Sequence, residues 1–99
     1  MKLKAVSHQE AMDLVAELRA MAELPPGTDR AALGRAKEIR FLLQGQAFAT
    51  PTSVAKADEV YRQLEVLLHP TRWRCELSLE FLRKEIKSSC DRLRAHLGG

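Results

Sequence analysis

The chain has 99 residues, of which 45% are hydrophobic and 29% charged, and its formal net charge is +3. This composition is too apolar for a disordered chain, and the length supports one domain with a modest core. A charge of +3 is too small to indicate a nucleic-acid binder unless the basic residues gather on one face. We therefore expect a single domain over residues 1–99, with residues 1–6 as a loose N-terminal arm.

Apolar residues are scattered along the chain and form no long runs. No purely apolar run exceeds three residues, as in VLL at 66–68, so no segment is predicted to span a membrane. The stretch MKLKAVSHQEAMDLV contains lysines without a following apolar run, which argues against a secretory signal. The sequence therefore predicts a cytoplasmic protein without a membrane partner.

The first helical segment is marked at both ends by residues that favour helix termini. It opens with a Ser-x-x-Glu pattern, in which the side chains of Ser7 and Glu10 each accept a backbone N–H of the other residue. The Pro-Pro-Gly sequence at 25–27 ends it. Its apolar residues recur three and four apart and form one stripe: Ala11, Leu14, Val15, Leu18, Met21 and Ala22.

The second helical segment begins directly after that turn. Thr28 is the expected N-cap, and Asp29 places a negative charge at the positive end of the helix dipole. Gly45 is the expected C-terminal stop. Gly34 costs helix stability, so we expect a neighbouring helix to approach closely there. The apolar stripe consists of Ala32, Ala36, Ile39 and Leu43.

Two further segments complete the chain. The third starts with Thr50 as cap and Pro51 at the first helical position, and Pro70 ends it. Its stripe contains Val54, Ala57, Val60, Tyr61, Leu64, Leu67 and Leu68. The fourth, residues 72–97, is the longest. Four amphipathic segments of helical period predict an all-α protein, a compact bundle of four helices with the last one longest.

The fourth segment is apolar on two opposite sides. One stripe runs along its full length and is expected to face the core: Cys75, Leu79, Leu82, Ile86, Cys90, Leu93 and Leu97. At about 100° per residue, Trp73, Leu77 and Phe81 form a second apolar band roughly 180° away. The second band can be shielded from water in two ways. Either Phe41 and Met12, which lie off their own stripes, cover the second band, or another protein molecule does.

Basic residues are also concentrated in the fourth segment. Residues 71–99 contain seven Lys or Arg and four Asp or Glu. The candidate phosphate- or anion-binding residues are Arg72, Arg74, Arg83, Lys87 and Arg94. Glu76 and Glu80 lie among or beside them, so the pattern is typical of a solvated charged face as well as of a phosphate-binding surface.

No motif of a catalytic or metal site occurs in the chain. His8, His69 and His96 lie in three different segments, and the sequence has neither a Cys-x-x-Cys pair nor a glycine-rich phosphate loop. We expect no enzyme activity, no metal and no cofactor. The leading hypothesis is a non-enzymatic helical protein that acts through protein–protein interaction, as a homodimer or by binding a target protein, through the second apolar band. The alternative is a nucleic-acid-binding regulatory or accessory protein that uses the basic residues of the last helix.

Overall fold

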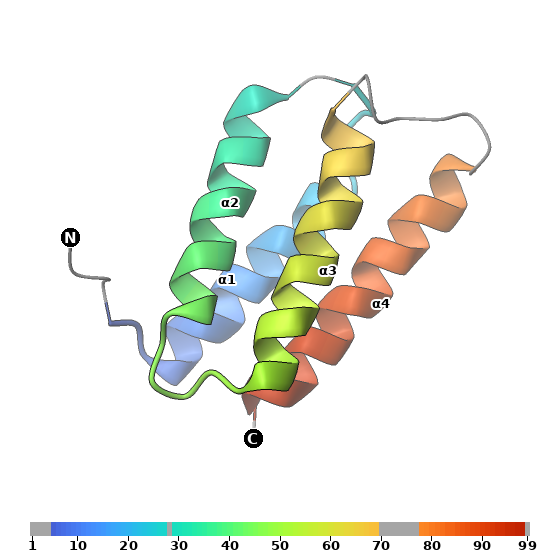
Figure 1. Cartoon of the computed structure of the whole chain (residues 1–99). Helices are drawn as coiled ribbons and strands as arrows, with labels where there is room; N and C mark the ends of the chain where they lie inside the picture. Colours follow the sequence, from blue (N-terminus) through green and yellow to red (C-terminus); the bar gives the residue numbers. More distant parts are fainter. Residues whose placement is uncertain (1–4, 28, 70–77, 99) are drawn as a thin grey trace.

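The structure, a computed structural model, describes residues 5–27, 29–69 and 78–98. Its helices are α1 (His8–Met21), α2 (Arg30–Gln44), α3 (Pro51–Leu68) and α4 (Leu79–Gly98) (Figure 1). None of the described residues lies in a strand. With 20 residues, α4 is the longest helix. The prediction of an all-α bundle of four helices with the longest one last is confirmed.

Successive helices run in opposite directions and form a closed ring. In Figure 1, α1 and α3 run upward, whereas α2 and α4 run downward. α3 packs against both α2 and α4, and α1 closes the ring by packing along α4. The contact between α1 and α2 is less extensive than these three. The connectivity is therefore that of an up-down-up-down four-helix bundle.

The stripes predicted from the sequence form the core. The buried apolar residues are Ala11, Val15, Leu18, Met21, Ala22, Ala36, Ile39, Leu43, Ala57, Val60, Leu64, Leu67, Leu68, Leu82, Ile86, Cys90, Leu93 and Leu97. Predicted stripe members at the edges of the core are half-buried: Leu14, Ala32, Val54, Tyr61 and Leu79. Cys75 lies outside the described residues. No described helix combines the length and the apolar character that a membrane span requires.

Three of the predicted helix ends are confirmed. The backbone N–H of Glu10 donates to Ser7 Oγ at 3.1 Å, and Glu10 Oε1 accepts the N–H of Ser7 at the same distance. Thr50 caps α3, with Pro51 in the first turn. Gly45 is the C-cap of α2, and its N–H donates to the carbonyl of Phe41. Local backbone bonding therefore sets these ends, as their sequence patterns indicate.

α2 begins at Arg30, with Asp29 as its N-cap in place of the predicted Thr28. The Asp29 carboxylate accepts the backbone N–H of Ala32 at 2.9 Å, which combines capping with a favourable charge at the helix N-terminus. Thr28 itself lies outside the described residues. α1 ends at Met21, earlier than the Pro-Pro-Gly sequence requires, and the N–H groups of residues 22–24 turn back to the carbonyls of residues 19–21.

α4 begins at Leu79, so the predicted continuous helix over 72–97 is wrong at its start. Ser78 is not helical, and its Oγ accepts the N–H of Phe81 at 3.0 Å while its carbonyl accepts the N–H of Leu82. A serine in this role is a helix N-cap. The spacing of the apolar residues is the same on both sides of Ser78, so the hydrophobic pattern alone did not indicate that the helix begins there. The rest of the predicted stretch before Ser78 lies outside the described residues.

Gly34 does not mark a close helix contact, contrary to the prediction. The residue is exposed, and a methyl group added at its Cα would meet no atom within 4 Å, the backbone of its own helix aside. The glycine therefore lowers helix propensity without a packing gain in the described part of the chain.

The end of the predicted N-terminal arm is attached to the bundle. The N–H of Val6 donates to Gln46 Oε1 at 3.0 Å, and Val6 packs against the core. The rings of His8 and Phe48 also approach each other, with centroids 5.8 Å apart. The connection between α2 and α3 thus holds the start of α1 in place, whereas residues 1–4 lie outside the described residues.

Candidate functional site

Phe81 is the member of the predicted apolar band that the structure describes; Trp73 and Leu77 lie outside the described residues. Phe81 is in the first turn of α4 and is 50% exposed. Phe41, the other large exposed apolar residue in the described part, is 60% exposed and lies in the last turn of α2. Since α2 and α4 run in the same direction, Phe41 is at the opposite end of the bundle (Figure 1). Met12, in the first half of α1, is also at that end, so neither residue covers Phe81.

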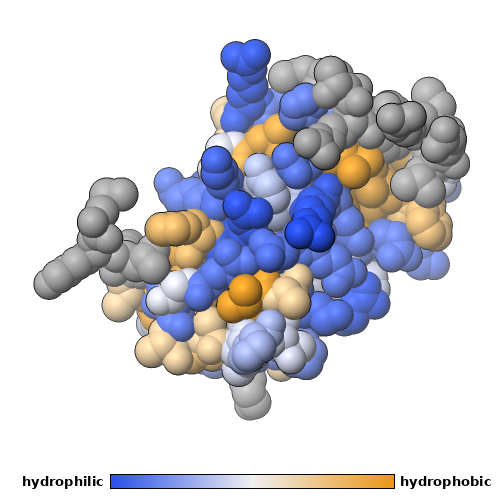
Figure 2. All heavy atoms as spheres, viewed as in Figure 1, coloured by the Kyte–Doolittle hydropathy of each residue, from blue (hydrophilic) through white to orange (hydrophobic). Residues whose placement is uncertain are grey.

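Phe81 borders an open groove between α3 and α4, with a volume of about 380 Å³. In Figure 2, hydrophobic atoms gather at the upper right, over the neighbouring ends of these two helices, and others lie at the left and lower part of the same face. The groove is lined by Arg62, Gln63 and Val66 from α3 and by Phe81, Leu82 and Glu85 from α4. We call it the α3–α4 groove.

The charged and polar groups of the α3–α4 groove lack partners in the described part of the chain. Neither Arg62 nor Glu85 forms an ion pair or hydrogen bond with a described residue. The Oε1 atom of Gln63 is buried and accepts no hydrogen bond from the described residues. Buried polar atoms usually have a partner, so an unpaired one beside a surface groove is unusual.

Further down the same helix pair, hydrogen bonds and ion pairs join α3 to α4 (Figure 1). Glu59 of α3 accepts a hydrogen bond from Ser89 Oγ at 3.3 Å and lies 3.7 Å from the guanidinium of Arg92. Lys56 approaches the other carboxylate oxygen of Glu59 at 3.6 Å. The contrast along one helix pair confines the open groove to the last turns of α3 and the first turns of α4.

The predicted anion-binding residue Arg83 makes contacts within the chain. Its Nε donates to the carbonyl of Ala22 and its Nη2 to the carbonyl of Leu24, both at 2.9 Å. These carbonyls lie at and just beyond the C-terminus of α1, where a cation complements the negative end of the helix dipole. Arg83 therefore ties α4 to the turn that follows α1.

Lys87 also has a partner in the chain. It forms an ion pair with Glu23, and the hydrogen bond from Lys87 holds the pKa of the Glu23 carboxyl below its ordinary value. Arg94 is exposed and forms no ion pair or hydrogen bond with a described residue. Arg72 and Arg74 lie outside the described residues. Of the predicted basic set, two members are engaged within the chain and one is free of such contacts among the described residues.

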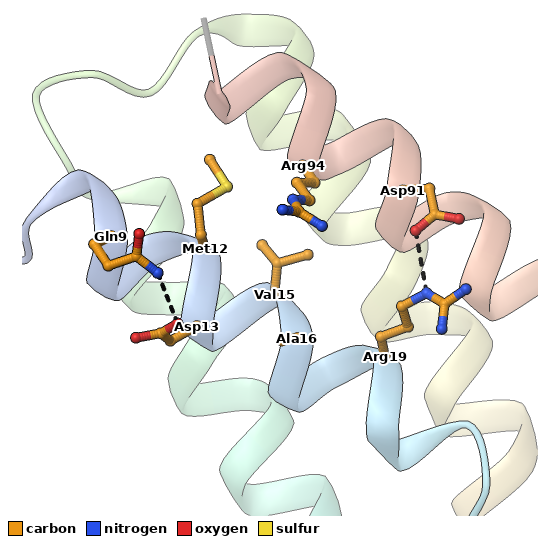
Figure 3. A pocket seen from close by; sticks show the side chains of 8 residues that line it. All are labelled: Gln9, Met12, Asp13, Val15, Ala16, Arg19, Asp91 and Arg94. Carbon is orange, nitrogen blue, oxygen red and sulfur yellow. Dashed lines mark hydrogen bonds and ion pairs between the residues drawn. The ribbon is translucent and has the colours of Figure 1, made fainter.

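Arg94 extends over a second, more polar depression between α1 and α4, with a volume of about 360 Å³. Figure 3 shows its guanidinium above Val15 and close to Met12, beside the Arg19–Asp91 ion pair. Nε of Arg19 lies 3.1 Å from Oδ1 of Asp91. Acidic and basic groups alternate along this depression, so it presents no surface of a single charge.

The carboxylates on α1 have partners as well. Asp13 accepts a hydrogen bond from Gln9, and Glu17 is bound by the guanidinium of Arg35, with Nη2 and Oε1 3.0 Å apart. The hydrogen bond from Arg35 lowers the pKa of Glu17, although partial burial acts in the other direction. Within residues 5–27, 29–69 and 78–98, no group of three or more His, Cys, Asp and Glu side chains is placed to hold a metal ion.

Sequence reasoning identified Phe81 but not the groove beside it. Arg62, Gln63 and Glu85 look like ordinary surface residues, and only the pairing of α3 with α4 brings them together. One signal was present in the sequence. Val66 is apolar yet lies outside the predicted core stripe of α3, and such a residue indicates a second apolar surface. Comparison with protein-family models, with curated proteins and with solved structures gave no match.

Proposed function

We propose that the protein acts by binding another protein molecule and not by catalysis, and that the α3–α4 groove is the contact surface. The observation that carries this proposal is the half-exposed Phe81 at the edge of a groove whose other apolar residues are Val66 and Leu82. Aromatic side chains contribute strongly to protein interfaces because they bury a large area with few rotatable bonds. Arg62 and Glu85, which have no partner among the described residues, supply polar groups beside this centre, as is typical of the rim of a protein interface.

The contacts that Arg83 and Lys87 make within the chain favour this proposal over nucleic-acid binding. Arg83 and Lys87 are bound to the carbonyls and the carboxylate that follow α1, so their positive charge is partly neutralised within the chain. A phosphate-binding surface needs several cations free to release counterions. Steep loss of duplex DNA or RNA binding with rising salt, abolished by Arg94→Ala, would support the alternative. A cytoplasmic location stays a prediction from the sequence.

Site-specific photo-crosslinking tests the proposal in native cells. A photoreactive phenylalanine analogue replaces Phe81 in one variant and Phe41 in the control, because both residues are exposed phenylalanines on helix surfaces. We expect a discrete protein adduct from position 81 and none from position 41. Absence of any adduct from position 81 above the level of the control would overturn the proposal.

A further inference from the structure

The second molecule at the α3–α4 groove is another copy of this chain, we infer, related to the first by a two-fold axis parallel to α3 and α4. This inference rests on the proposed function and names the partner of the same site. It follows from the order of residues on the two walls of the groove and from their charges.

The heights of the residues along the groove are set by the antiparallel packing of α3 and α4. Glu59 of α3 lies opposite Ser89 of α4, as their hydrogen bond shows. One turn further along α3 brings Arg62 level with Glu85, because each turn upward on α3 matches one turn toward the N-terminus of α4 (Figure 1). The next turn brings Val66 level with Phe81. Each level thus has one wall residue from α3 and one from α4.

A two-fold axis parallel to the helices keeps every residue at its height and exchanges the two walls. Val66 of one copy then faces Phe81 of the other, and Arg62 of one copy faces Glu85 of the other. Both contacts occur twice, as in any interface with two-fold symmetry. The apolar residues meet each other and the opposite charges meet each other, so the groove is self-complementary in this arrangement.

A two-fold axis perpendicular to the helices, directed across the groove, gives the opposite result. It keeps the walls in place and inverts the heights, so α3 faces α3 and α4 faces α4 of the second copy. Midway between the two levels, this axis puts Arg62 against Val66 and Glu85 against Phe81, where charged groups lose water without a partner, which is costly. At the level of Arg62 and Glu85 it brings like charges together, and at the level of Val66 and Phe81 it leaves Arg62 and Glu85 without an opposite charge. Charge complementarity therefore selects the axis parallel to α3 and α4.

The apolar part of the groove is small, because it consists of Val66 on α3 and Phe81 and Leu82 on α4. Interfaces at the low end of the size range form weak complexes, so we expect a dissociation constant on the order of micromolar. Sedimentation equilibrium with the full chain between about 1 and 500 μM covers that range. Circular dichroism of each variant confirms that its helical fold is kept.

Two single charge reversals test the arrangement. Arg62→Glu brings two carboxylates together at both symmetry-related contacts of its own dimer, and Glu85→Arg brings two guanidinium groups together in the same way. Each variant alone should dimerise at least tenfold more weakly than the wild type at low salt, a loss of about 1.4 kcal/mol. An equimolar mixture of the two variants should recover wild-type affinity. In the mixed dimer, the new glutamate at position 62 of one chain faces the new arginine at position 85 of the other, and the native Glu85 and Arg62 face each other at the second contact. The double variant Arg62→Glu/Glu85→Arg should likewise recover the dimer.

The outcomes separate this inference from the proposed function. If the wild type dimerises and Phe81→Glu abolishes dimerisation, but neither the mixture nor the double variant recovers affinity, the two-fold arrangement is wrong while the groove remains the contact surface. If the wild type stays monomeric while position 81 crosslinks to a different protein, the second copy is wrong as partner and the proposed function stands. If the wild type stays monomeric and position 81 yields no adduct, both are overturned.

Discussion

The two sides of α4 differ in how completely their polar groups are paired within the chain. On the side of α1, Arg83, Lys87 and Asp91 each bond to α1 or to the turn that follows it. On the side of α3, the upper groove leaves Phe81 half exposed and Glu85 without an ion-pair partner among the described residues. The comparison indicates that the α1–α4 contact serves the stability of the fold, whereas the polar groups of the α3–α4 groove stay unpaired among the described residues, at the place where we propose that another molecule binds.

The same helix therefore supplies both the fold and the proposed interface, and substitutions should separate the two roles. Residues on the α1 side and in the core should change the free energy of unfolding and leave self-association unchanged. The groove residues Arg62, Phe81 and Glu85 should change self-association with little effect on the free energy of unfolding. Variants at Ile86, Phe81 and Arg83 test this distinction directly.

The largest effect is expected at Ile86, which is fully buried on the core face of α4. Ile86→Ala should lower the free energy of unfolding by about 2–5 kcal/mol, because it removes buried methyl groups and leaves a cavity. Phe81→Ala, on the exposed side of the same helix, should lower it by less than about 1 kcal/mol. Urea denaturation of both variants measures the difference. Equal destabilisation would place Phe81 in the core and remove the distinction between the two sides.

Arg83→Met should have the next largest effect. The substitution keeps much of the aliphatic length but removes both hydrogen bonds to the carbonyls after α1, with an expected loss of about 1–2 kcal/mol. Lys84→Met on the exposed neighbouring position is the matched control and should cost little. If Arg83→Met is neutral in urea denaturation, the α1–α4 contact does not depend on this residue.

Gln63→Met should stabilise the monomer slightly. The Gln63 oxygen is buried without a hydrogen-bond donor in the described part of the chain, and an apolar side chain of similar shape removes that penalty. We expect a gain of roughly 1 kcal/mol, measured in the Phe81→Glu background so that association does not contribute. A loss of similar size would show that the Gln63 oxygen has a partner in the folded chain.

The smallest effect concerns pH and the contact between α1 and α2. Arg35 lowers the pKa of Glu17 below its ordinary value of 4.5, so folding favours the ionised carboxylate. This contribution is present above pH 4.5 and is lost as pH falls through the lower pKa of the folded state. Glu17→Gln and Arg35→Gln should each make the free energy of unfolding less sensitive to acid. An unchanged pH profile in both variants would contradict this role of the pair.

Most of the fold was predictable because its determinants are local. Helical periodicity identified the core stripes, and Ser7, Thr50 and Gly45 carry the side-chain or backbone preferences that set helix ends. Ser78 was missed because a cap at the edge of a continuing apolar stripe leaves the period unchanged. The prediction of a close helix contact at Gly34 was wrong, because the sequence shows the glycine but not whether a neighbouring helix passes it. None of the described helices does so.

The candidate site was less predictable because it depends on how the helices pair. The angular position of Phe81 on its own helix indicated a second apolar surface, and the structure places Phe81 half exposed. The opposing residues Arg62 and Val66 belong to a different helix, and no pattern within either helix joins them to Phe81. The sequence pattern indicated that Arg83 could bind phosphate, because it shows where the cations are but not which groups they contact. The acceptor of Arg83, the carbonyl of Ala22, lies just beyond the end of α1.

The weight-average mass in sedimentation equilibrium tests the central claim most directly. We predict that the mass of the wild type rises with concentration from 11.1 kDa towards twice that value, and that Phe41→Glu behaves in the same way. Phe81→Glu should remain at 11.1 kDa over the whole range with an unchanged helical circular dichroism spectrum. A wild type that stays at 11.1 kDa, or a Phe81→Glu variant that either dimerises normally or unfolds, would contradict self-association through the α3–α4 groove.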